Sequence, residues 1–188
     1  ENNPFLKGLE FLNPIFNAIS HKKCIEISYQ PFGKQEFTTN FFPYHLKQFN
    51  SRWFLFGQNP NYESLTNYPL DRINMVNEID IPFSETEIDF EEYFEDVIGV
   101  TLNEGQPEII ELKVNSKLWP YIETKPLHGS QKIKQRDENY VFITLHVIPN
   151  FELEKLILSF GEDIIVYSPT HFQDTIKCRL QKNLNAYD

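Results

Sequence analysis

The chain has 188 residues, and its content of 40% hydrophobic and 15% aromatic residues is typical of a globular protein rather than a disordered one. Every apolar run is shorter than the roughly 20 residues that a membrane span requires, so we expect no contact with a membrane. Two isolated cysteines form neither a disulfide framework nor a zinc site, and they favour a cytoplasmic location.

The net charge of −10 comes from one segment of the chain. Residues 84–111 contain ten acidic side chains and neither lysine nor arginine, which leaves 17 acidic and 17 basic residues elsewhere. The overall acidity therefore does not exclude nucleic acid as a partner, because local basic patches outside this segment can still contact phosphates.

Residues 1–20 are interpreted as a helical lead-in, with an amphipathic helix over 9–20 that Asn13 caps. The apolar period then changes to two and predicts five short strands within residues 21–82. They cover residues 24–29, 36–42, 52–58, 65–70 and 75–81. Pro43 is expected to end the second of them. Five short strands with turns between them predict a small barrel or sandwich.

The strand over 52–58 begins with Arg52 and continues with aromatic and aliphatic residues. Strand alternation places Trp53 and Leu55 on one face and Arg52 and Phe54 on the other. We therefore expect Trp53 to point into the core.

Residues 83–107 are interpreted as an acidic helix and linker. Residues 108–188 then alternate between strands and helices. The predicted strands cover 109–114, 133–134, 140–148 and 164–167, and the helices lie around 118–122, 151–159 and 170–184. This β-α-β-β-α-β succession is typical of a ferredoxin-like α+β domain.

Catalysis is poorly supported by the sequence. The five histidines have no metal-binding spacing, no serine lies in a nucleophile elbow, and no glycine-rich phosphate loop is present. We expect no catalytic residues, no metal and no cofactor.

Ligand binding is better supported, because guanidinium groups suited to phosphates occur together with aromatic rings on which bases stack. The predicted ligand-binding residues of the barrel are Tyr29, Tyr44, His45, Lys47, Arg52, Phe54 and Arg72. This combination suits a nucleotide-like ligand or single-stranded nucleic acid. The alternative is that the aromatic residues form core and that Asp71 pairs with Arg72.

A second basic stretch covers residues 125–136 and contains no acidic residue. It suggests a secondary polyanion contact formed by His128, Ser130, Lys132, Lys134 and Arg136. The alternative is a solvated loop and an edge strand that charged side chains protect.

Four segments follow one another in the first part of the chain: Ile27-Ser28-Tyr29, Phe42-Pro43-Tyr44-His45-Leu46, Arg52-Trp53-Phe54-Leu55 and Leu70-Asp71-Arg72-Ile73. Together they resemble the WYL domain. The family is named for a Trp-Tyr-Leu triplet, which reads Trp53-Phe54-Leu55 here. The part from about residue 107 is similar to the extension that usually follows WYL domains. The resemblance implies an Sm-like, SH3-type five-stranded barrel with a ligand-sensing pocket at these positions.

The resemblance also implies a function. We expect the sensor part of a bacterial transcriptional regulator, which forms a homodimer and reaches DNA through a separate N-terminal domain outside this chain. The alternative is a protein–protein interaction or dimerisation module without a small ligand.

Overall fold

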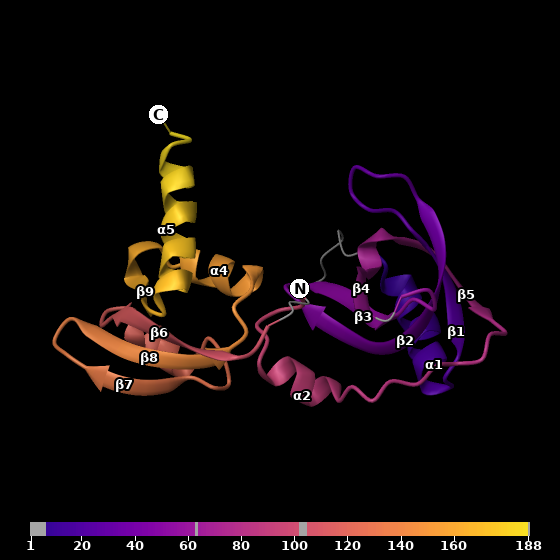
Figure 1. Cartoon of the computed structure of the whole chain (residues 1–188), viewed down its shortest axis with the longest axis horizontal. Coiled ribbons are helices and arrows are strands. Elements are labelled where there is room, and N and C mark those ends of the chain that lie inside the picture. The colour runs from indigo at the N-terminus through magenta and orange to yellow at the C-terminus, as the bar shows by residue number, and fades with distance from the viewer. Residues whose placement is uncertain (1–6, 63, 102–104, 188) are drawn as a thin grey trace. The chain divides into compact units, whose positions relative to one another are not determined.

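The computed structural model describes residues 7–62, 64–101 and 105–187. The chain divides into two compact units, one ending at Phe90 and one beginning at Glu91 (Figure 1). Each unit has a hydrophobic core of its own. In the part of the chain that is described, no helix is long and apolar enough to cross a membrane.

The first unit begins with a 3₁₀ turn, η1 (Leu9–Phe11), that runs directly into helix α1 (Leu12–Ser20). Asn13 was predicted as the N-cap, and this was wrong: Phe11 occupies that position and makes no side-chain cap. The 3₁₀ turn satisfies one of the amides that a helix leaves free at its start, because the Leu12 N–H donates to the carbonyl oxygen of Leu9. Helix α1 buries Ile15 and Ala18 in the core.

The five predicted strands of the first unit are present and form one sheet. They are β1 (Cys24–Tyr29), β2 (Phe37–Phe49), β3 (Arg52–Gln58), β4 (Leu65–Pro69) and β5 (Ile73–Ile79). Their order is β4-β3-β2-β1-β5, and all neighbours are antiparallel. The predicted closure into an Sm-like barrel is not observed: β4 and β5 are the two ends of this order, and no pairing joins them among the described residues.

Strand β2 is longer than predicted because Pro43 does not end it. Residues 37–41 pair with β1 and residues 42–49 with β3, and a bulge lies between Pro43 and His45. Proline is tolerated at a bulge because the ladder is already interrupted there and no proline N–H is needed. The hairpin that follows is closed by Asn50 and Ser51, whose φ angles are 47° and 60°.

The core of the first unit lies between α1 and the inner face of the sheet. Leu55 is completely buried, and Trp53 packs against the same cluster while remaining half-buried. Strand alternation therefore oriented Trp53 and Leu55 as predicted. Gly57 has no room for a side chain, since a Cβ there would lie 2.1 Å from the carbonyl oxygen of Phe42.

The acidic segment contains a shorter helix than predicted. Helix α2 covers only Phe90–Glu95, and residues 83–89 have neither helix nor strand structure. Residues 84–89 contain a single apolar residue, Ile88, so a helix there would bury little. Instead, Phe83 and the carbonyl oxygen of Ser84 contact strand β2.

The second unit has the predicted succession of strands and helices. Its elements are β6 (Glu108–Asn115), α3 (Trp119–Thr124), β7 (Lys132–Arg136), β8 (Tyr140–Val147), α4 (Phe151–Leu158), β9 (Ile164–Ser168) and α5 (Thr170–Leu184). The strands form an antiparallel sheet in the order β7-β8-β6-β9. Asn150 caps α4 by accepting a hydrogen bond from the Leu153 amide at 2.9 Å.

Candidate ligand-binding site

Arg72 is the centre of the candidate site. It ends the 3₁₀ turn η2 (Leu70–Arg72) between β4 and β5, and its carbonyl oxygen accepts a hydrogen bond from the Gln30 amide at 2.9 Å. Its Nη1 donates to the Tyr29 hydroxyl at 3.4 Å, and its guanidinium lies 4.0 Å from the centre of the Phe32 ring. The Nε of Arg72 is buried and has no hydrogen-bond partner among the described residues.

Arg52 joins this site through Asp71. The Nε of Arg52 lies 3.3 Å from Oδ2 of Asp71, so this carboxylate pairs with Arg52. The alternative to ligand binding had predicted that Asp71 pairs with Arg72. The other oxygen, Oδ1, is buried without a hydrogen-bond partner in the described part of the chain. The site therefore contains two cationic groups, one carboxylate, and one unpartnered polar atom on each of two neighbouring residues.

Aromatic rings surround Tyr29 on the same side of the sheet. The ring centre of Tyr29 lies 4.7 Å from that of Tyr68 and 5.7 Å from that of Phe37. Burial raises the pKa of the Tyr29 hydroxyl, and the positive charge of Arg72 beside it opposes that rise. Phe37 and Phe32 expose 40% and 72% of their surface, so they offer accessible rings next to buried ones.

Phe32, Phe37 and Tyr68 were not among the predicted site residues. The signal for Phe37 is its register: it lies directly opposite Tyr29 in the β1–β2 pair. That register cannot be read from one strand, because it depends on which residues of β2 pair with β1. Phe32 belongs to the site because its ring lies against Arg72, and Tyr68 because its ring lies against Tyr29. Both contacts join residues far apart in the sequence.

Three of the predicted residues lie on the other face of the sheet. In the β2–β3 pair, His45 lies opposite Phe56 and Lys47 lies opposite Phe54. The pair between them, Leu46 and Leu55, faces the core, so the side chains of His45, Lys47 and Phe54 point to the other face. Burial, followed by the charge of Lys47, lowers the pKa of His45, and burial lowers the pKa of Lys47. The structure therefore separates His45, Lys47 and Phe54 from Arg72 and Tyr29.

Tyr44 and His45 contact the chain's own acidic segment. The Tyr44 hydroxyl donates to the carbonyl oxygen of Ser84 at 3.0 Å, and the Phe83 ring lies edge-on to Tyr44 at 5.8 Å. Phe90 stacks on His45 with the ring centres 4.8 Å apart and the planes 8° apart. Residues 83–90 thus occupy the surface where these two side chains were predicted to meet a ligand.

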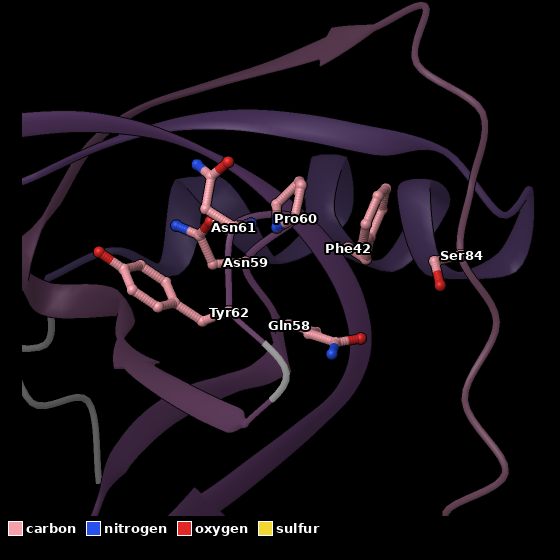
Figure 2. Close-up of a pocket in the computed structure, with 7 residues that line it drawn as sticks. All are labelled: Phe42, Gln58, Asn59, Pro60, Asn61, Tyr62 and Ser84. Atoms are coloured by element: carbon pink, nitrogen blue, oxygen red, sulfur yellow. Dashed lines mark hydrogen bonds between the residues drawn. The ribbon is translucent and has the colours of Figure 1, made fainter.

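A cavity of about 320 Å³ opens beside the loop between β3 and β4. Figure 2 shows its lining, with Tyr62 at one side of the view and Ser84 at the other. The lining residues are Phe42, Gln58, Asn59, Pro60, Asn61, Tyr62 and Ser84. None of them carries a charge and none was predicted as a site residue, so this cavity lacks the cationic groups that hold phosphates.

The second basic stretch is largely engaged in internal contacts. The Nζ of Lys134 lies 2.8 Å from Glu111, and Arg136 lies 3.1 Å from Glu123. His128 contacts the Ser130 hydroxyl at 2.8 Å, and that hydroxyl accepts from the His146 amide at 2.8 Å. Lys132 is exposed on the edge strand β7.

No group of histidine, cysteine, aspartate or glutamate side chains within the described residues could hold a metal ion. Cys24 is buried and Cys178 is exposed, and neither forms a disulfide.

Two larger proteins of known structure are similar to this chain. Proteasome accessory factor B/C (PafBC) of Arthrobacter aurescens matches with 16% identity and a TM-score of 0.42 over 92% of this chain and 26% of that chain. A CRISPR Cas-related protein matches with 13% identity and a TM-score of 0.51 over 97% of this chain and 52% of that chain. The chain thus spans about a quarter and about half of the lengths of these two proteins.

A search of curated proteins found no match. Comparison with protein families is decisive, since residues 10–78 match the WYL domain and residues 106–184 match the WCX domain. The WCX match covers the part that the resemblance had described as the extension after the WYL domain. The chain therefore belongs to the WYL domain-containing proteins, and its WYL domain is followed by a WCX domain.

Proposed function

We propose that this chain is the ligand-sensing part of a bacterial transcriptional regulator. Its ligand is nucleotide-like or single-stranded nucleic acid, and it binds at Arg72, Arg52 and the aromatic residues around Tyr29. The WYL domain supports a regulatory sensing role. The charge and ring chemistry of the site supports the class of ligand.

The observation that carries this proposal is the Nε of Arg72, which is buried and has no hydrogen-bond partner among the described residues. A buried donor without a partner costs about 1–3 kcal/mol, and more when the group is charged. A small rearrangement that lets a ligand phosphate or carbonyl oxygen reach Arg72 would remove this cost. The folded protein therefore has a free-energy reason to accept an anionic ligand at this position.

The aromatic side chains beside Arg72 supply the second half of the recognition. Phe32 exposes a large part of its ring beside the guanidinium, and Phe37 does so beside Tyr29. Bases stack on such faces without regard to sequence. Arg52 adds a second cation, although its pairing with Asp71 reduces the positive charge that it presents. The site thus matches a phosphate flanked by a planar base.

The proposal includes the wider assembly. DNA is bound by a separate domain, and the regulator is a homodimer in the cytoplasm. An interaction module without a ligand is the competing function.

Fluorescence anisotropy with a labelled oligothymidylate tests the site. Arg72→Ala should weaken binding by about tenfold or more, since a hydrogen bond to a charged group contributes about 1.5–3 kcal/mol. Arg72→Lys should give an intermediate loss, because lysine keeps the charge but not the planar fork of donors. Lys34→Ala, an exposed lysine of the same unit, is the matched control.

Binding by Arg72→Ala that equals wild-type binding would overturn this assignment. If the same variant also changes the molecular mass measured by light scattering, the interaction module becomes the better function.

A further inference from the structure

The sheet of the second unit has one face covered by helices and one open face. Ile110 and Leu112 of β6 point to the covered face and pack with side chains of α3, α4 and α5. Figure 1 shows α4 and α5 on one side of this sheet. Alternation then places Ile109, Glu111 and Lys113 on the opposite side, which we call the open face.

The open face carries a group of aromatic side chains. Tyr140 and Phe142 of β8 lie on this face because they pair with Asn115 and Lys113 of β6. The ring centre of Phe142 lies 5.3 Å from that of Tyr167 in β9, in an edge-to-face contact. The Tyr167 side chain is 58% exposed. The Nζ of Lys113 lies 3.7 Å from the centre of the Tyr140 ring, so a cation and a ring already meet on this surface.

The charge of the open face is positive, although the chain is acidic. Lys113, Lys132 and Lys134 extend from its strands, and Glu111 is the one acidic side chain that alternation places among them. Glu111 is neutralised by Lys134 at 2.8 Å. His146 also lies on this face, and it is 3.6 Å from Asp96. Among the described residues, Lys113 and Lys132 have no acidic partner, so the face keeps a net positive charge even when Asp96 is counted with Glu111.

This charge decides between two occupants of the face. A symmetric dimer buries the same patch of both copies against each other, so two surfaces of like net charge would meet and Lys113 and Lys132 would lose their hydration. A polyanion meets no such repulsion. In other sheet-based modules, aromatic rings on an open four-stranded sheet stack on the bases of single-stranded nucleic acid, and lysines beside them contact its phosphates. Here Tyr167 is the exposed ring, whereas Phe142 is only 7% exposed and supports it from below.

We propose that the open face of the WCX domain is a second binding site for single-stranded nucleic acid. Tyr167 stacks on a base. Lys113, which lies against the Tyr140 ring, contacts the next nucleotide together with that ring, and Lys132 contacts a phosphate. This inference rests on the proposed function for the class of ligand. It differs from the predicted secondary contact, since Lys134 and Arg136 are already paired and only Lys132 is common to both.

Affinity measurements on the full chain test the site. The probe is a fluorescein-labelled oligothymidylate of about 20 nucleotides, which is longer than a single small domain occupies. The double variant Tyr167→Ala/Lys113→Ala should bind it about tenfold or more weakly, with a shallower dependence on salt. Tyr121→Ala/Lys117→Ala is the matched control, since it removes an exposed tyrosine and an exposed lysine from the part of the unit around α3.

Photo-crosslinking separates this site from the site at Arg72. A 5-iodouracil oligonucleotide should crosslink to Tyr167 or Tyr140, as located by mass spectrometry, and it should still do so in Arg52→Ala/Arg72→Ala. Crosslinks that persist while the Arg72 variants bind normally contradict the proposed function and retain the second site.

Three outcomes would overturn the second site. The first is a double variant that binds like its matched control. The second is an absence of crosslinks on the open face. The third is a change of molecular mass in light scattering as the only effect of the double variant, which would make the face an interface between copies. Circular dichroism confirms that each variant is folded before it is scored.

Discussion

Trp53 shows at the scale of one residue how packing limits the effect of a substitution. Its side chain packs against the core of the first unit but stays half-buried. Trp53→Ala should therefore lower the free energy of unfolding by about 2 kcal/mol, which is less than the roughly 3–5 kcal/mol of a fully buried aromatic side chain. Urea denaturation followed by circular dichroism measures this difference.

A free energy of unfolding that does not change in Trp53→Ala would contradict the inward orientation of this residue. Tyr62→Ala is the control, since Tyr62 is 67% exposed and its loss should change stability by no more than about 0.5 kcal/mol.

His45 links the stability of the protein to pH. Burial lowers its pKa in the folded state, so the unfolded chain binds a proton more readily near the ordinary histidine pKa of about 6.5. The stability of the fold is therefore complete above that pH and falls as the pH drops below it. His45→Phe should remove this part of the pH dependence, as measured by urea midpoints at about pH 5.5 and about pH 7.5.

His21→Gln, a change at an exposed histidine, should keep the pH dependence of the wild type. Equal dependence on pH in wild type and His45→Phe would show that His45 is not responsible.

The predicted site residues lie on two different faces of the first sheet, and the sequence of a single strand does not show this. Arg72 and Tyr29 meet because η2 lies beside β1, as the hydrogen bonds from Arg72 to Tyr29 and from Gln30 to Arg72 show. His45 and Lys47 have suitable chemistry but lie on the other face of the sheet from Tyr29. Their face depends on the bulge at Pro43, which shifts the register of β2 against β3.

At the scale of elements, the strands were predictable where alternation and turns coincided. All five strands of the first unit and the succession of the second were found this way. The end of β2 was not, because Pro43 lies where the strand changes partner from β1 to β3. A change of partner is a tertiary event, and the local pattern around a proline gives no sign of it.

The turn between β2 and β3 offers a test of backbone strain. Both Asn50 and Ser51 have positive φ angles, as a two-residue type I′ hairpin requires, and glycine is the preferred residue at the second position. Asparagine tolerates this conformation, whereas serine does so at a cost. Ser51→Gly should therefore raise the free energy of unfolding by about 0.5–1 kcal/mol in urea denaturation.

Ser51→Ala should bring no such gain, since alanine keeps the Cβ that makes the positive φ unfavourable. A Ser51→Gly variant that is less stable than the wild type would show that the turn is not strained at this position.

For the whole molecule, the two hydrophobic cores share no residue. Each core contains or packs against one of the two tryptophans, Trp119 in the second unit and Trp53 in the first. The chain therefore has one natural fluorescent reporter for each unit. Variants with a single tryptophan, Trp119→Phe or Trp53→Phe, make each unit visible by itself.

Core substitutions in these backgrounds should act on one unit at a time. Ile27→Ala and Ile143→Ala each remove part of a completely buried side chain, which should cost about 2–5 kcal/mol. Ile27→Ala should lower the urea midpoint reported by Trp53 and leave that of Trp119 unchanged, and Ile143→Ala should do the reverse. If either substitution shifts both midpoints equally, the two units unfold as one cooperative structure, and a ligand bound to one of them would stabilise both.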